Sequence, residues 1–395
     1  MKKMNQRYLM LVLSFLFWFS QSTYTPYQTT YLTSAGYSLS VVGTVLGCYG
    51  VTQLVLRFPI GLFADLKNKH RYIIMIGAVL TGVSALIRFM MPTAFGFLVA
   101  NLCAGIACSA WISYMVFFSG LYKDHEMQKS TALIIACSNG GGMLAYIMGT
   151  LYYTRYGMPL MCVLSLIAAI FAVLLSFAIR EQEDVPLVLT QDSESVMHKI
   201  GNSIRIACCH PRILIFSFAA LVQQGILNTV TLNMTAQHAK EIGANSFDLG
   251  LLAVLYMGEA VIFAFLATSR WCIKKGARFF ITLIFLLLVI YCILMPYTTT
   301  LLQINLLQIC CALSQGILFT FATSEALKDI PTEVRGTAMG FHQAVFAIGI
   351  TFVPMITGSC MQKYTMGIAY GMLAILCVAA ILAVNLFYTY EHKIK

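Results

Sequence analysis

Long apolar stretches recur along the chain, and each has about the length that a helix needs to cross a lipid bilayer. A helix that rises about 1.5 Å per residue crosses the hydrocarbon core with roughly 20 residues. Because no water is present there to satisfy backbone polar groups, such stretches fold as helices. The predicted spans are 8–32, 41–63, 72–91, 94–121, a fifth that begins near Ser130, and then 159–179, 213–236, 249–268, 279–296, 301–327, 336–360 and 367–388.

Composition places the chain in a membrane. Of its 395 residues, 59% are hydrophobic and only 10% are charged, which excludes an ordinary soluble protein of several domains. The formal charge of +10 is not that of a nucleic-acid binder, because the bases form no single run and no zinc-finger or stacking motif accompanies them. We predict an all-α polytopic membrane protein with twelve transmembrane helices, a monomer with the lipid bilayer and a small molecule as partners.

The distribution of basic residues predicts the orientation. With the amino terminus inside, twenty of the 25 Lys and Arg residues fall in cytoplasmic segments, and Arg57 lies within a span. This asymmetry follows the positive-inside rule and requires an even number of crossings. Both termini are therefore expected in the cytoplasm, and the protein in the plasma (cytoplasmic, inner) membrane. The outer segments hold Arg88, which we expect to snorkel to the interface, Arg155, Lys240 and Lys363.

Cysteines and the amino terminus add no cofactor or processing signal. The 13 cysteines lie mostly within apolar runs, where they act as small core residues. The pairs Cys208-Cys209 and Cys310-Cys311 lack the spacer and second pair of a zinc site. No small-residue cleavage site follows the basic start, so residues 8–32 form a first span rather than a removed signal peptide. We expect no metal and no cofactor.

A loop between the second and third spans carries a distinctive pattern. The segment GLFADLKNKHR, residues 61–71, places a carboxylate and a basic cluster directly after a span. It resembles the signature loop of the major facilitator superfamily, although Leu66 stands where a base is common and Asn68 where Gly is usual. A second segment, PTEVRGTAMG at 331–340, is similar to another recurring motif of that superfamily. The residues at the motif positions are Gly61, Ala64, Asp65, Asn68, Lys69, Arg71, Arg335 and Gly336.

The resemblance implies a domain plan. A bacterial member of the twelve-helix type would have an amino-terminal six-helix bundle (1–179), a cytoplasmic tether (180–212) and a carboxy-terminal six-helix bundle (213–395). Each bundle would consist of inverted three-helix repeats that rock about a midplane site. The tether has the composition of a linker, and Ile200, Ile204 and Ile206 predict a short amphipathic helix on the anionic inner leaflet.

The two motifs predict a cytoplasmic gate. Unpaired N–H groups at the start of a helix favour an anion, so Asp65 is expected near the amino end of the span that begins at Gly336. The resemblance implies that this contact latches the two halves when the outside is open. Scattered surface charge is the plainer alternative. The predicted gate residues are Gly61, Asp65, Lys69, Arg71, Glu325, Arg335 and Gly336.

Three ionisable residues are candidates for proton coupling. Glu259 lies about ten residues into a predicted span, or about 15 Å deep. A carboxylate there is costly unless it is paired, hydrated or protonated, so it is a functional candidate by default. The alternative is a structural, protonated Glu. Arg57 and His342 are secondary candidates, and Arg57 would pair with Asp65, another carboxylate or helix-end carbonyls.

Amide and hydroxyl side chains inside spans predict a polar cavity. Gln224, Asn228 and Thr231 are four and three residues apart, so they share one helix face. A single amide more often bonds a neighbouring helix than a ligand. Their concentration in three spans favours a cavity, because in the resembled family those spans line the pathway. The predicted cavity residues are Gln21, Tyr24, Gln28, Gln224, Asn228, Thr231, Gln308 and Gln315.

These features predict a secondary active transporter of a small solute that works by alternating access and proton coupling, not an enzyme. No phosphate-binding loop is present, so ATP-driven transport is unsupported. A drug or metabolite efflux antiporter is an alternative, although the fifth span lacks the Gly-Pro pair of the antiporter signature and its Gly140-Gly141-Gly142 run predicts helix packing. A membrane sensor that keeps the fold without transporting remains a third reading.

Overall fold

The computed structural model describes residues 3–67, 69–180 and 193–394, and every regular element within these ranges is a helix. Contacts divide the chain into two compact units. The first comprises Met1–Lys123, Cys137–Cys208 and Asp329–Ala344, and the second comprises Asp124–Ala136, Cys209–Lys328 and Val345–Lys395. The all-helical prediction is confirmed for the part that the structure describes.

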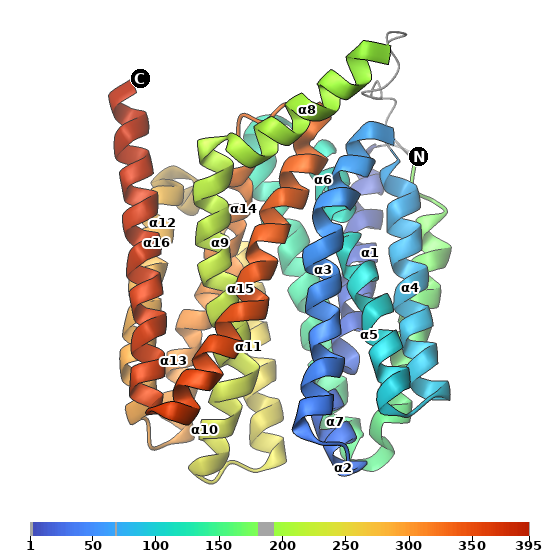
Figure 1. The fold of residues 1–395 in the computed structure, drawn as a ribbon, viewed down its shortest axis with the longest axis vertical. Helices are drawn as coiled ribbons and strands as arrows, with labels where there is room; N and C mark the ends of the chain where they lie inside the picture. The colour runs from blue at the N-terminus through green and yellow to red at the C-terminus, as the bar shows by residue number, and fades with distance from the viewer. Residues whose placement is uncertain (1–2, 68, 181–192, 395) are drawn as a thin grey trace. The chain divides into compact units, whose positions relative to one another are not determined.

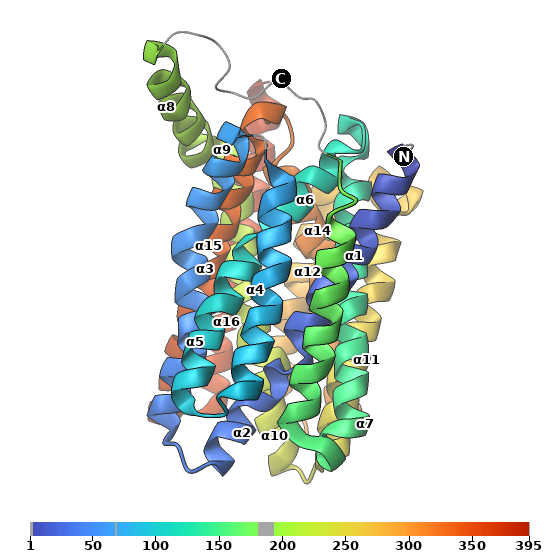
Figure 2. The same ribbon diagram turned by 90° about the vertical axis from the view of Figure 1, so that its right-hand side faces the viewer.

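The core of the first unit is three helices that follow one another in the chain. Helix α5 packs against both α3 and α4, and Figure 2 shows the pair α4 and α5 side by side. Its elements are α1 (Lys3–Thr23), α2 (Gln28–Ser34), α3 (Leu39–Lys67), α4 (His70–Met90), α5 (Ala94–Ser109), α6 (Trp111–Gly120), most of α7 (Met127–Ser176), α8 (Ser193–Cys209) and the first turns of α15 (Arg335–Lys363).

The second unit contains the remaining helices (Figure 1). Helix α12 packs most extensively against α16, and α9 packs against α14 and α16. The elements are α9 (Pro211–Thr229), α10 (Thr235–Glu241), α11 (Ser246–Leu266), α12 (Arg270–Leu294), α13 (Leu301–Leu313), α14 (Phe319–Ala326), the rest of α15 and α16 (Met366–Ile394).

Helix length and composition identify the candidate membrane spans. Among the described residues nine helices are long and apolar enough to cross a bilayer, and a tenth candidate is the pair Ile200–Cys209 and Pro211–Thr229, bent by 56°. Helix α7 has 50 residues, about 75 Å at 1.5 Å per residue, which is too long for one crossing. It breaks at Gly157, where φ is +63° just before Pro159. The number of crossings stays a prediction.

Several predicted spans are interrupted rather than continuous. The first is broken by a 3-10 turn at Thr25–Tyr27 that contains Pro26, because Pro has no N–H to continue the helical ladder. The span predicted at 213–236 contains a π-helical turn, η3, at Val230–Met234. The span predicted at 301–327 contains a second π-helical turn, η5, at Ser314–Leu318. Such turns occur often at functional sites.

The predicted tether is only partly described. Residues 181–192 lie outside the described part of the chain. The segment after them forms α8, in which Ser203 and Ala207 are buried while Arg205 is exposed. The prediction of a helix in this segment is confirmed. Its amphipathic character and its position on a membrane surface stay predictions.

Small residues bring helices into close contact, as the glycine run predicted. A Cβ built at Gly141 of α7 would lie 2.3 Å from the carbonyl oxygen of Phe15 in α1. In the second unit, a Cβ at Gly316 of η5 would lie 2.7 Å from the backbone nitrogen of Ala264 in α11. At these positions a larger side chain would separate the helices.

Candidate functional site

Asp65 caps the amino end of α15 within the first unit. Its side chain is 8% exposed. Its Oδ1 accepts a hydrogen bond from the backbone nitrogen of Gly336 at 2.8 Å, and its Oδ2 accepts from the backbone nitrogen and the hydroxyl of Thr337 at 2.5 and 2.6 Å. These are the N–H groups that a helix leaves without an internal partner, and the helix dipole favours a negative charge there. Asp65 and Gly336 therefore lie together, as their motifs suggested.

Three glycines let α3 and α15 touch backbone to backbone at this point. A Cβ at Gly61 would lie 2.2 Å from the carbonyl oxygen of Gly336, and a Cβ at Gly336 would lie 2.3 Å from Asp65 Oδ1. A Cβ at Gly340 would lie 2.8 Å from the carbonyl oxygen of Arg57. Sequence reasoning missed Gly340, although its spacing of four from Gly336 is the signal of a close helix contact.

The basic residues of the two motifs have their own contacts. Arg71 donates from Nη2 to the carbonyl oxygen of Phe177 at 3.1 Å. Lys69 places its ammonium 5.8 Å from the ring centre of Tyr72. Arg335 is buried and donates from Nε to the carbonyl oxygen of Ile330 at 3.1 Å.

Arg57 lies deeper on α3 and contacts α15 as well. Its side chain is 3% exposed, donates from Nη1 to the carbonyl oxygen of Gln343 at 3.1 Å, and donates from Nη2 to the side-chain oxygen of Gln53. From sequence we had considered a helix-end carbonyl as one partner, and the carbonyl of Gln343 lies within α15 rather than at its end. His342, the neighbour of Gln343, is fully buried.

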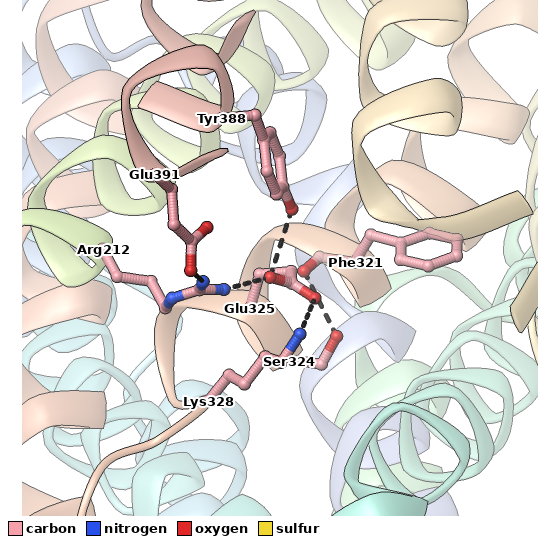
Figure 3. A network of polar contacts seen from close by, with 7 residues as sticks. All are labelled: Arg212, Phe321, Ser324, Glu325, Lys328, Tyr388 and Glu391. Carbon is pink, nitrogen blue, oxygen red and sulfur yellow. Dashed lines mark hydrogen bonds and ion pairs between the residues drawn. The ribbon is translucent and has the colours of Figure 1, made fainter. Parts of the chain in front are cut away.

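Glu325 belongs to a charge network in the second unit (Figure 3). Its Oε2 pairs with Arg212 and accepts from the Tyr388 hydroxyl at 3.1 Å, and its Oε1 lies 3.6 Å from Lys328 Nζ. Arg212 also donates from Nη2 to Glu391 Oε1 at 2.5 Å. The guanidinium thus joins α14 to α16 at the start of α9.

Sequence reasoning assigned Glu325 to the gate and missed these partners. The available signal was depth, because Arg212, Glu325 and Glu391 all lie at the cytoplasmic ends predicted for their spans. Depth alone does not say which span ends are neighbours. The structure adds that information by packing α9 against both α14 and α16.

The amides of the second unit are placed at the two π-helical turns. Gln308 of α13 donates to the carbonyl oxygen of Thr231 in η3 at 3.3 Å. Gln223 of α9 donates to the carbonyl oxygen of Ser314 in η5 at 3.4 Å. Each turn is therefore bonded by an amide from the opposite helix. Sequence reasoning predicted neither hydrogen bond and did not include Gln223 among the cavity residues.

The other predicted cavity residues of this unit lie on the same helices. Asn228 donates to the carbonyl oxygen of Gln224 at 3.0 Å, one turn earlier on α9. The hydroxyl of Thr231 donates to the carbonyl oxygen of Leu227. Gln224 is buried and Gln315 is half-buried. These two bonds stay within one helical segment.

The amino-terminal candidates form a polar network in the first unit. The Tyr24 hydroxyl donates to Gln21 Oε1 at 2.7 Å, and Gln21 Nε2 donates to the carbonyl oxygen of Ala104 at 3.2 Å. Gln28 is buried. The Arg88 guanidinium stacks 3.8 Å from the ring centre of Tyr24 and is 1% exposed. The prediction that Arg88 snorkels is wrong, because its helix face points into the unit rather than toward the interface.

Glu259 lies half-buried on α11, 13 residues from its start, or about 20 Å along the axis. Within the described part of the chain it makes no hydrogen bond and no ion pair. Leu255 and Ile262, one turn to either side, are exposed, so Glu259 is a carboxylate in an otherwise apolar exposed stripe. The adjacent face of α11 packs against η5 through Ala260 and Ala264.

A family comparison agrees with this architecture. The family model described as Major Facilitator Superfamily matches residues 10–236 and 213–395. The chain belongs to this superfamily. It is therefore a multi-pass membrane protein and a membrane transporter, as the two motifs suggested.

Relatives are distant but cover most of the chain. An uncharacterized MFS-type transporter of Methanocaldococcus jannaschii is 23% identical over 330 residues, which is 82% of this chain and 83% of that protein. The inner membrane transport protein YajR of Escherichia coli is 22% identical over 82% of this chain and 70% of its own length. The crystal structure of the human organic anion transporter MFSD10 (TETRAN) superposes with a TM-score of 0.80 over 97% of this chain and all of that chain, at 12% identity, and thus shows a shared fold.

Proposed function

We propose that the chain is a secondary active transporter that moves a small solute by alternating access and couples this movement to protons, without covalent chemistry. The observation that carries the proposal is the capping of α15 by Asp65. In the proposed architecture twelve helices form two six-helix bundles, 1–179 and 213–395. The protein spans the inner (cytoplasmic) membrane, and both termini lie in the cytoplasm.

The Asp65 contact has the properties of a releasable latch. It joins α3 to the first turn of α15 by hydrogen bonds from Gly336 and Thr337, while the part of α15 from Val345 onward belongs to the second unit. Hydrogen bonds to a charged acceptor are worth about 1.5–3 kcal/mol each, enough to hold one state and weak enough to be exchanged for water. Release would free α15 to move with the second unit.

Glu259 is the proposed proton-coupling residue. A half-buried carboxylate without a partner among the described residues can exchange its proton when its surroundings change between wet and dry. A carboxylate within a span is otherwise expensive, which supports a functional reason for its presence. The amides Gln21, Gln28, Gln224, Asn228, Gln308 and Gln315, with Tyr24 and Thr231, are the proposed solute contacts, and Arg57 and His342 are secondary coupling candidates.

Transport by proteoliposomes tests the proposal. The reconstituted protein should accumulate a solute when a pH gradient is imposed, and solutes of different charge classes are screened. Glu259→Gln should keep exchange of solute across the membrane at equal pH and lose accumulation driven by protons. Glu241→Gln is the matched control, because that carboxylate is 60% exposed at the end of α10.

Two results separate the claims. If Glu259→Gln still accumulates solute when protons drive it, the coupling assignment fails while transport stands. If the wild-type protein neither exchanges nor accumulates any solute class, the transport proposal itself fails.

A further inference from the structure

Arg88 is a buried cation whose described partners are all neutral. It donates from Nη1 to the carbonyl oxygen of Ser84 at 3.2 Å and to the hydroxyl of the same residue, and from Nη2 to Asn101 Oδ1 at 2.5 Å. Its plane lies over the ring of Tyr24. No carboxylate of the described chain pairs with it, and its buried Nε donates to no acceptor there.

A guanidinium in this position keeps its charge, because arginine is not deprotonated in proteins. A charge that is removed from water without a counter-ion is strongly unfavourable, in soluble proteins and in membranes alike. Stacking on an aromatic ring and amide hydrogen bonds compensate only a part of it. An anion is the partner that the site lacks among its own residues.

The Nε edge of the guanidinium has the geometry for a carboxylate, and its Nε has no acceptor among the described residues. Carboxylates bind arginine best through two parallel N–H groups on one edge. On Arg88 the Nε edge includes Nη2, which is held by Asn101, a neutral acceptor. A carboxylate that replaces Asn101 Oδ1 would accept from both nitrogens. Asn101 stays anchored by donating from Nδ2 to the carbonyl oxygen of Val45 at 3.0 Å.

The network lies near the ends of three helices of the first unit. Arg88 is two residues before the end of α4, Asn101 is seven residues after the start of α5, and Val45 is six residues after the start of α3. At 1.5 Å per residue these positions are about 3 to 10 Å from the helix ends. In the proposed topology these are the outer ends, so a solute would reach the site from outside.

A pocket of about 280 Å³ lies beside the network. Val45 belongs to both, since its carbonyl binds Asn101 and the residue lines the pocket. The lining is almost entirely apolar, which suits a hydrocarbon or aromatic body rather than a sugar. The lining residues are Val41, Thr44, Val45, Ala94, Phe95 and Leu98.

We propose that Arg88, stacked on Tyr24, binds the carboxylate of a small amphipathic organic anion in place of Asn101 Oδ1, and that the apolar body of this anion occupies the adjacent pocket. The inference rests on the proposed transport function and deepens it by naming the substrate class. It makes Arg88 a substrate-binding residue of the first unit and separates the site from the Asp65 latch.

Equilibrium binding tests the site without transport. Full-length protein in phosphatidylcholine nanodiscs is titrated with benzoate, neutral benzamide and cationic benzylamine. Benzoate should bind at least tenfold more tightly than the other two. Arg88→Gln should weaken benzoate about tenfold to a hundredfold, the effect of losing a charge-assisted bidentate contact, and leave benzamide unchanged. Arg155→Gln is the matched control, because Arg155 also stacks on a tyrosine, 5.2 Å from the ring centre of Tyr156, but is exposed.

Two further measurements keep the test decisive. If Arg88→Gln does not fold, Arg88→Lys keeps the charge and loses the bidentate edge, so it should bind benzoate with intermediate affinity. In nanodiscs that contain phosphatidylglycerol, benzoate affinity should not change. A fall would mean that a lipid headgroup occupies the site and would overturn its assignment to a soluble anion.

The proposal is overturned if benzoate binds wild-type protein no better than benzamide, or if Arg88→Gln binds benzoate as tightly as wild type. Failure of the transport proposal gives a different result. A protein that binds benzoate through Arg88 but moves no solute in proteoliposomes keeps this site and loses its proposed function.

Discussion

Removal of Arg212 should destabilise the second unit more than removal of any other charge in its network. The side chain is 5% exposed and pairs with two carboxylates, Glu325 and Glu391, whose side chains are 15% and 24% exposed. Arg212→Gln leaves these two acids side by side without their shared cation. Lys328 is a weaker substitute, since its side chain is 55% exposed and 3.6 Å from Glu325.

The magnitude follows from burial. Breaking a buried ion pair by removing one partner typically destabilises by about 3–5 kcal/mol. Partial exposure of both acids places Arg212→Gln near the lower end, at about 3 kcal/mol. With an unfolding entropy of about 2.1 cal/mol/K per residue over 395 residues, this corresponds to a fall in Tm of about 4 °C. Lys328→Gln should change stability by less than about 1 kcal/mol, as exposed ion pairs do.

The assay is thermal unfolding of purified protein in detergent, followed by the fraction that remains monodisperse. Arg212→Gln should have the lowest Tm, and Lys328→Gln should match wild type. The double variant Arg212→Gln with Glu325→Gln should regain part of the loss, because one of the two unpaired acids is then neutral. Equal Tm values for Arg212→Gln and Lys328→Gln, or a double variant that is less stable than Arg212→Gln, would refute the reasoning.

Three further predictions concern helix contacts. Gly61→Ala should fold and lose most transport, because its Cβ would lie 2.2 Å from the carbonyl oxygen of Gly336. Gly47→Ala is the control, because a Cβ there would have no atom within 4 Å. The uptake rates of the two variants test this prediction. Asp65→Asn removes the charge at the α15 cap and should lower stability by about 0.5–2 kcal/mol, measured as a Tm shift. Gln223→Leu should change the free energy of unfolding by no more than about 1 kcal/mol, also measured as a Tm shift, because its single neutral hydrogen bond to η5 contributes little net stability.

Hydropathy sufficed to predict where the helices lie, and the two loop motifs sufficed to bring Asp65 to the start of α15. The interruptions were harder. The 3-10 turn at Pro26 has a local cause in the missing N–H, whereas the π-helical turns η3 and η5 have no comparable residue. Each accepts a hydrogen bond from an amide of another helix, and this contact depends on tertiary packing.

The wrong prediction for Arg88 shows that the depth of a residue in its span does not predict which way its side chain points. Its position near the end of a span suggested an interfacial side chain, and that position is right. The packing of α4 on α5 sets which way this helix face points. There the Arg88 guanidinium donates to Asn101 and stacks on Tyr24. The partners of Glu325 were missed for the same reason, since neighbouring span ends are a property of the packed unit.

The division of the chain into units has a consequence for biosynthesis. Residues 329–344 complete the first unit although they are translated near the end of the message, and residues 124–136 belong to the second unit although they emerge early. Each unit therefore includes a segment that is far in sequence from the rest of that unit, so its full set of contacts requires most of the chain. A product that stops within residues 180–212 would carry an Asp65 without the helix that it caps.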